Sequence, residues 1–133
     1  MSEKGLIKSL ELNEKNILFI SGDNNKLKNY YLDSTALIYP SKNEGFGFPP
    51  LEAMSFGCPV ITSSNPAILE ATGLSEFSFN PESPQDIAVK LEDIIYSKDN
   101  IEFLIKQGLT RIKQLSWEKT SDEILAIYNK LLN

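Results

Sequence analysis

The stretch NEGFGFPPLEAMSFGCPV (Asn43–Val60) combines residue types that the interiors of helices and strands disfavour. Gly45 and Gly47 let the backbone take positive φ and approach a ligand closely, while Pro49 and Pro50 suit the first turn of a helix. This order predicts a glycine loop that runs into a helix N-terminus. Such an N-terminus offers free amides and a partial positive charge, which together suit a phosphate.

Two glutamates flank this loop. Glu44 precedes the glycines, Phe46 lies between them, and Glu52 falls in the expected first turn of the helix. A carboxylate accepts two hydrogen bonds, which suits the vicinal diol of a sugar or a ribose. The alternative is purely structural: a glycine pair can be a simple turn, and a first-turn glutamate often only complements the helix dipole.

The elements that must position these residues follow from the apolar pattern. Short β-rich runs predict strands, and between and after them apolar residues spaced by three and four predict helices. Strands that are apolar on both faces and alternate with helices indicate a parallel sheet, covered on both sides and built by right-handed crossovers. The expected strands are Ile17–Ser21, Ala36–Tyr39, Pro59–Thr62 and Phe77–Phe79.

This pattern predicts a doubly wound α/β domain with about four parallel strands and helices on both faces. Ser83 and Pro84 open a helix in the usual way, and two C-terminal helices are expected at Ile101–Leu115 and Ser116–Leu132, with Trp117 as an apolar anchor. The glycine loop follows the strand Ala36–Tyr39. It therefore lies at the carboxyl end of a strand, where open α/β sheets bind their ligands.

Composition narrows the function further. The chain has 133 residues, 18 acidic against 13 basic side chains, a net charge of -5 and no histidine. The charge disfavours nucleic acid and anionic membranes as partners, and imidazole chemistry is excluded. We expect one cytoplasmic globular domain without an integral membrane segment, in which the single cysteine, Cys58, is a buried core residue.

The segment PSKNEGFGFPPLEAMSFGCPVITS (Pro40–Ser63) closely resembles the signature of the retaining, GT-B-fold glycosyltransferases of family 4 (group 1), with its Glu, seven residues, Glu spacing. The resemblance covers nearly the whole chain. Its other parts are NILFISG (Asn16–Gly22), the helix Leu27–Tyr31, ILEATG (Ile68–Gly73), FSFNPESPQDIAVKL (Phe77–Leu91) and SWEKTSDEILAIYNKLL (Ser116–Leu132).

The resemblance implies a nucleotide-diphosphate sugar as donor substrate, a UDP-, GDP- or ADP-sugar, with no metal and no other cofactor. By it, Glu44 is the catalytic-site residue that holds hydroxyls of the donor sugar. The segment Gly45, Phe46 and Gly47 presents backbone to the sugar and the diphosphate, and Glu52 binds the ribose diol. Glu70 matches a family glutamate, and we interpret it as structural.

The resemblance also implies missing parts. Residues 1–133 match a single partial, truncated Rossmann-like C-terminal domain, without the acceptor domain and without the first two strands of the donor domain. In the strand order 3-2-1-4-5-6 those strands would lie between Ile17–Ser21 and Ala36–Tyr39. We expect these two segments to pair directly instead; the alternative is that another chain inserts strands between them. Two candidate partners follow: an acceptor-domain protein chain and a second copy of this chain.

Two functional hypotheses remain. In the first, the chain is a donor-binding part of a glycosyltransferase, inactive alone and dependent on a partner chain or a missing N-terminal half. In the second, it is a non-catalytic remnant or a nucleotide-sugar-binding and assembly module. A phosphorylatable receiver domain of similar length is disfavoured, because Ser21–Asp23 supplies one acidic residue where a cluster is needed.

Overall fold

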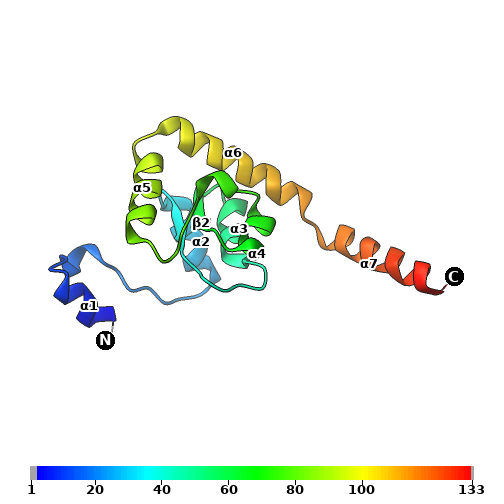
Figure 1. Cartoon of the computed structure of the whole chain (residues 1–133), viewed down its shortest axis with the longest axis horizontal. Helices are drawn as coiled ribbons and strands as arrows, with labels where there is room; N and C mark the ends of the chain where they lie inside the picture. The colour runs from blue at the N-terminus through cyan, green and yellow to red at the C-terminus, as the bar shows by residue number, and fades with distance from the viewer. Residues whose placement is uncertain (1–2, 133) are drawn as a thin grey trace.

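A computed structural model describes residues 3–132 of the chain. A central body of strands and helices has α1 projecting from one side and α7 from the other (Figure 1). In chain order the elements are α1 (Glu3–Ser9), the 3-10 turn η1 (Glu14–Asn16), α2 (Asn24–Asp33), β1 (Leu37–Tyr39), α3 (Phe48–Ser55), β2 (Val60–Ser63), α4 (Pro66–Thr72), the 3-10 turn η2 (Ser75–Phe77), β3 (Ser78–Phe79), α5 (Pro84–Ile95), α6 (Lys98–Gln114) and α7 (Trp117–Leu132).

The sheet is parallel, with strand order β1-β2-β3. Its register places Tyr39 of β1 beside Thr62 of β2, and Ser63 of β2 beside Phe79 of β3. All four residues of β2 are buried, as expected for a central parallel strand covered on both faces. The predicted α/β class with a parallel sheet is confirmed, and three of the four predicted strands lie within two residues of their expected bounds.

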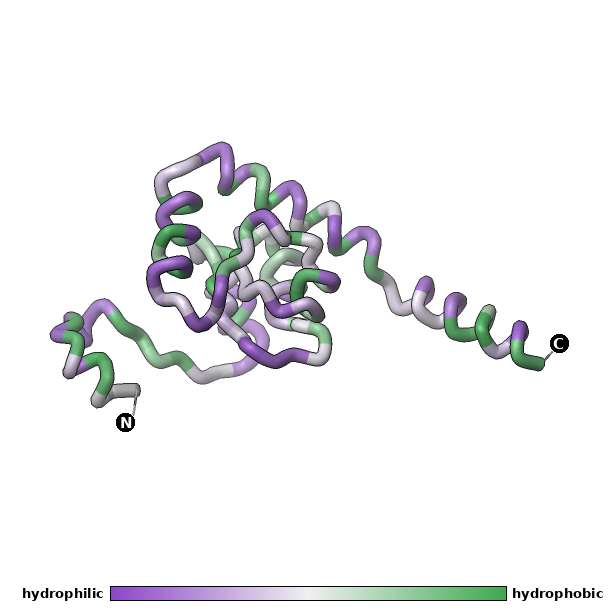
Figure 2. The backbone as a smooth tube through the Cα atoms, in the orientation of Figure 1, coloured by the Kyte–Doolittle hydropathy of each residue, from purple (hydrophilic) through white to green (hydrophobic). Residues whose placement is uncertain are grey.

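The fourth predicted strand, Ile17–Ser21, is wrong. This segment pairs with no strand among the described residues, so the sheet has three strands rather than about four. Leu18 is 74% exposed and Phe19 is 56% exposed, and Figure 2 shows an apolar stretch of tube outside the body. β-rich composition gives a segment the tendency to form a strand, but only a neighbouring ladder stabilises one. The direct pairing with Ala36–Tyr39 does not form.

The core lies between the sheet and the helices packed on it. Its fully buried side chains include Met54, Ile61, Phe79, Ile94 and Leu104. Helices α3 and α6 approach closely, because an added Cβ at Gly108 would come within 2.9 Å of the Met54 side chain. Cys58 is buried, as predicted, and its burial raises the pKa of the thiol.

The predicted helices after β3 are confirmed. Ser83 caps α5 by accepting from the Asp86 amide, and Ser97 caps α6 by accepting from the Asn100 amide, each at 3.2 Å. The anchoring role predicted for Trp117 is wrong: its side chain is 76% exposed, and α7 has no buried residue.

Candidate functional site

The glycine loop leaves β1 and enters α3 as the sequence predicts. Gly47 is the N-cap of α3 in the left-handed region, with φ 92°, and Pro49 and Pro50 lie in the first turn. Gly45 differs from the expectation, since its φ is not positive and a Cβ added to it would meet nothing within 4 Å. Neither backbone conformation nor protein packing therefore requires glycine at position 45. The space in front of it is open.

The start of α3 offers few backbone donors. The first amides of a helix lack intrahelical partners, but Pro49 and Pro50 carry no N–H. The amides that remain at this end are those of Gly47 and Phe48, and no side chain caps them. An anion at this helix end would therefore rely on two amides and the helix dipole.

The Glu44 carboxylate is held by the residues that lead into the loop. The Tyr39 hydroxyl donates a hydrogen bond to Glu44 Oε1. This bond, and a weaker contribution from the Ser41 hydroxyl, lower the pKa of Glu44, while the same contact with Glu44 raises the pKa of Tyr39. Glu44 is half-buried. The structure thus presents an ionised, oriented carboxylate at the carboxyl end of β1.

The backbone of this loop is tied to the neighbouring strand and helix. Ser63 Oγ donates to the Ser41 carbonyl at 2.5 Å, and Asn65 Nδ2 donates to the Lys42 carbonyl at 2.8 Å. Asn65 Oδ1 also caps α4 by accepting from the Ala67 amide at 2.9 Å. The carboxyl ends of β1 and β2 lie side by side, so the last residue of β2 and a residue just after it fix the loop after β1.

Glu52 is placed differently from the expectation. It is exposed and belongs to the second turn of α3, because the first turn contains no acidic residue. Burial raises the pKa of Tyr31, and the charge of Glu52 raises it further. Tyr31 in turn contributes to the raised pKa of Tyr39. Glu44 and Glu52 therefore each raise the pKa of a different tyrosine, Tyr39 and Tyr31.

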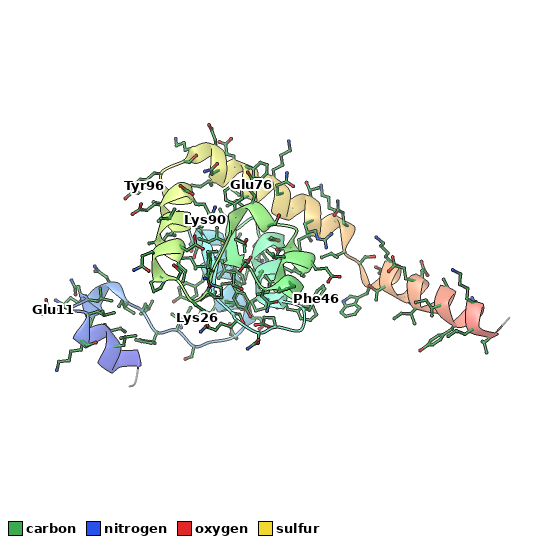
Figure 3. The ribbon with its side chains drawn as sticks, viewed as in Figure 1. Glu11, Lys26, Phe46, Glu76, Lys90 and Tyr96 are labelled. Carbon is green, nitrogen blue, oxygen red and sulfur yellow. The ribbon has the colours of Figure 1, made fainter. Side chains whose placement is uncertain are left out.

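Two aromatic side chains border the loop on its solvent side. Phe46 is 41% exposed and Phe48 is 55% exposed, and their ring centroids lie 5.2 Å apart in a tilted arrangement. Figure 3 shows Phe46 at the rim of the central body. Exposed rings beside an open backbone provide an apolar surface on which a sugar or a base could pack.

A cavity of about 230 Å³ lies elsewhere, between the loop Ile20–Asn24 and the start of α2. It is lined by Lys26, Leu27 and Tyr30 as well as by that loop, and it includes neither Glu52 nor any residue of Glu44–Gly47. The five predicted site residues therefore lie outside this cavity; Gly45, Phe46 and Glu52 are exposed, Glu44 is half-buried and Gly47 is buried.

Glu70 lies on α4 near the packing of α6. Its backbone carbonyl accepts from Arg111 Nη2 at 2.6 Å, and the Ala71 carbonyl accepts from Arg111 Nε at 2.7 Å. Among residues 3–132 no group of three or more acidic or cysteine side chains could hold a metal ion. Within the same residues, no helix is both long and apolar enough to cross a membrane.

Sequence reasoning missed three residues that build the site: Tyr39, Ser63 and Asn65. The apolar pattern indicates Tyr39 only as a strand residue, although it ends its strand and precedes the Glu44 carboxylate by five positions. Ser63 and Asn65 end β2 and begin α4, and adjacent parallel strands end at one edge of a sheet. That rule could have placed both residues beside the glycine loop.

A parallel α/β fold with a glycine loop and a held carboxylate at the carboxyl edge of its strands is typical of ligand-binding Rossmann-like domains. The profile of the family described as "Glycosyl transferases group 1" matches residues 2–111. The chain belongs to this family.

Relatives and a solved structure agree with this assignment. The chain is 32% identical over 101 residues to O-antigen chain mannosyltransferase B of Escherichia coli, covering 76% of this chain and 26% of that protein. It is 35% identical over 101 residues to O-antigen chain mannosyltransferase RfbU of Salmonella typhimurium, covering 76% and 29%. A sucrose-phosphate synthase from Thermosynechococcus elongatus superposes with a TM-score of 0.80 at 26% identity, over 97% of this chain and 33% of that one.

This chain therefore spans about a quarter to a third of the length of these proteins. The structural match identifies the α/β body as a fragment of GT-B type.

Proposed function

We propose that the chain is the donor-binding part of a retaining glycosyltransferase of family 4, a single partial C-terminal domain of the GT-B fold over residues 1–133. In this proposal it binds a nucleotide-diphosphate sugar, a UDP-, GDP- or ADP-sugar, for transfer of a glycosyl group to an acceptor. Its membership in the group 1 family supports the reaction class. The mannosyltransferases among its relatives, which include the two O-antigen chain enzymes, make GDP-mannose the first donor to test.

One observation carries the proposal: the loop combines a held carboxylate with a glycine that the protein itself does not need. Glu44 is oriented by Tyr39, and the space in front of Gly45 is empty. A glycine with ordinary φ and no close neighbour is explained when another molecule approaches the backbone at that point. A sugar that hydrogen-bonds Glu44 would lie next to that space.

The roles of the residues follow from their chemistry. Glu44, the proposed catalytic-site residue, accepts hydrogen bonds from hydroxyls of the donor sugar. The amides of Gly47 and Phe48 donate hydrogen bonds to the diphosphate. Glu52 accepts hydrogen bonds from the ribose diol. The acceptor attacks on the face of the leaving diphosphate, so the protein mainly supplies orientation and charge stabilisation. Such a reaction needs no histidine, and the proposal includes neither a metal nor another cofactor.

A partner is part of the proposal, with a cytoplasmic location. The cation nearest in sequence to the loop, Lys42, already pairs with Glu82 at 3.0 Å. A diphosphate would therefore need further positive charge, which an acceptor-domain chain would bring along with the acceptor site. A homodimer is the other candidate assembly, because β1 is an edge strand among the described residues and Ile17–Ile20 is unpaired.

The alternative is a non-catalytic remnant or a nucleotide-sugar-binding and assembly module. The exposed apolar segment Ile17–Ile20 favours it, because a surface of this kind suits contact with another chain. Copurification with an acceptor-domain chain and transferase activity of that complex would favour the catalytic hypothesis. Donor binding without activity in any such complex would favour the module.

Calorimetric titration of the purified chain with UDP, GDP, ADP and the corresponding glucose or mannose donors tests the proposal. We expect saturable binding of one nucleotide family and weaker binding by Glu52→Ala. Glu76→Ala is the matched control, because Glu76 is an exposed glutamate on η2, outside the loop (Figure 3). The donor-site proposal fails if no nucleotide or donor binds at millimolar concentration. The ribose role fails if Glu52→Ala binds as tightly as the control.

A further inference from the structure

We infer that Tyr39 is a positioning residue for Glu44: its hydroxyl fixes one carboxylate oxygen so that the rest of the carboxylate faces the donor sugar. This inference rests on the proposed function, which it deepens by assigning sugar affinity to a residue outside the glycine loop. The observation behind it is the hydrogen bond from Tyr39 Oη to Glu44 Oε1.

The two ends of this contact are anchored by different means. Tyr39 is the last residue of β1 and pairs in register with the fully buried Thr62, so the sheet fixes its backbone. Glu44 lies on the loop, whose preceding turn is held by Ser63 and Asn65. The tyrosine hydroxyl therefore links a rigid strand to the functional carboxylate five residues later.

The chemistry of a carboxylate leaves room for a ligand. An ionised carboxylate offers about four lone-pair sites on its two oxygens. The Tyr39 hydroxyl occupies one of them on Oε1, and the Ser41 hydroxyl also lies close enough to lower the pKa of Glu44. The remaining sites, including those on Oε2, can accept hydroxyls of a sugar.

Restricting Glu44 before a donor arrives has a direct benefit for affinity. A free glutamate side chain loses rotamer freedom when a ligand immobilises it, and that loss weakens binding. The hydrogen bond from Tyr39 restricts this side chain by contacts within the protein alone. The lowered pKa of Glu44 has the same cause, because a hydrogen bond from the Tyr39 hydroxyl favours the charged form of the carboxylate.

The test compares Tyr39→Phe with wild type and with Tyr96→Phe. Tyr96 lies at the exposed end of α5, so its variant is a matched loss of a hydroxyl away from the loop (Figure 3). Two readouts are measured: the pKa of Glu44, by NMR titration of its carboxyl carbon, and calorimetric binding of GDP, GDP-mannose, UDP and UDP-glucose. Melting temperatures confirm that both variants fold.

We expect Tyr39→Phe to raise the pKa of Glu44 and to weaken binding of the nucleotide sugar by about two- to tenfold, the cost of immobilising one side chain. Binding of GDP or UDP should stay unchanged, because these ligands lack the transferred sugar that contacts Glu44. In the double variant Tyr39→Phe, Glu44→Gln, the loss should match that of Glu44→Gln alone, since both act through one carboxylate.

The outcomes separate the two claims. If wild type binds a donor and Tyr39→Phe binds it equally well, the positioning role is wrong and the proposed function stands. Equal losses for the sugar and for the bare diphosphate would show a structural role for Tyr39 and overturn the inference. If wild type binds no nucleotide or donor, the proposed function fails. Separately, an unchanged pKa of Glu44 in Tyr39→Phe would show that the Tyr39 hydroxyl does not position the carboxylate.

Discussion

Replacing Gly47 by alanine tests whether the loop geometry depends on a single backbone position. Gly47 caps α3 with φ 92° and ψ 56°, a left-handed conformation that an L side chain disfavours. Its added Cβ would lie 3.3 Å from Cγ1 of Ile68, a side chain of α4 that is fully buried. The substitution therefore combines backbone strain with a steric conflict that Ile68 has little room to relieve.

The magnitude follows from these terms. The left-handed conformation costs a non-glycine residue about 1–2 kcal/mol. The conflict with Ile68 adds about 1 kcal/mol, the lower end of the cost of overpacking. The lower entropy of the unfolded alanine variant offsets about 0.5 kcal/mol of this. The free energy of unfolding should fall by about 2 kcal/mol, which for a chain of this size lowers the melting temperature by about 8 °C.

Urea denaturation of wild type, Gly47→Ala and Gly45→Ala provides the assay. Gly45→Ala is the matched control, because its Cβ meets nothing within 4 Å and its φ is not positive. It should leave the free energy of unfolding within about 0.5 kcal/mol of wild type, like other surface substitutions. Gly47→Ala should lower the urea midpoint by about 1 M without changing the slope.

Equal stability of the two alanine variants would refute this reasoning. It would mean either that the loop relaxes freely or that Gly47 does not have the left-handed conformation in solution. Donor binding should also distinguish Gly45 from Gly47, because the variant that keeps its stability is expected to lose affinity. Under the proposed function, Gly45→Ala places a methyl group where the donor approaches, so it should weaken donor binding while leaving stability intact.

Three further predictions concern the packing and the titration of the body. Gly108→Ala should lower the free energy of unfolding, measured in urea, by about 1–2 kcal/mol. The added Cβ would lie 2.9 Å from Cγ and 3.2 Å from Cβ of Met54, and this steric conflict exceeds the gain in helix propensity. Unchanged stability would show that α3 and α6 can separate at no cost. Arg111→Met should lower the free energy of unfolding by about 1–2 kcal/mol, because it removes two hydrogen bonds to carbonyls of α4. The control Lys113→Met, at an exposed position on α6, should lower it by less than about 0.5 kcal/mol. Equal losses would contradict the role of the guanidinium. The stability difference between wild type and Tyr39→Phe should be largest at neutral pH. This difference should shrink as pH falls through the lowered pKa of Glu44, below 4.5, and as pH rises toward the raised pKa of Tyr39, above 10.0. A pH-independent difference would show that the Tyr39 hydroxyl does not bond the Glu44 carboxylate.

The sequence predicted those strands whose partners lie close along the chain. Ala36–Tyr39 and Pro59–Thr62 are apolar runs separated by one short helix, and they pair as adjacent parallel strands. Ile17–Ser21 has the same composition and the same kind of connection through α2, yet it remains unpaired. The composition of a segment indicates only its tendency to form a strand. Pairing is a property of two segments together, since β1 has a free edge among the described residues and Ile17–Ser21 still does not pair with it.

The backbone of the candidate site was predicted apart from the positive φ of Gly45, whereas the side chains that support it were missed. Glycine and proline report φ and helix starts locally, so the position of the loop and the start of α3 could be found from Gly47 and Pro49 alone. The hold of Tyr39 on Glu44 spans a strand end and a loop, and the bond from Ser63 to Ser41 crosses two strands. Contacts of that kind need the register of the sheet, which periodicity does not give.

The contacts that fix the glycine loop all come from residues that follow α2 in the chain. Tyr39 holds Glu44, Ser63 and Asn65 hold the turn before it, and Ile68 packs beneath Gly47. None of them involves the segment Ile17–Ile20, although that segment is where the structure departs most from the expected sheet. These four contacts therefore do not depend on the placement of that segment. Under the proposed function, donor recognition at the sugar can persist in this chain while catalysis awaits the partner that brings the acceptor.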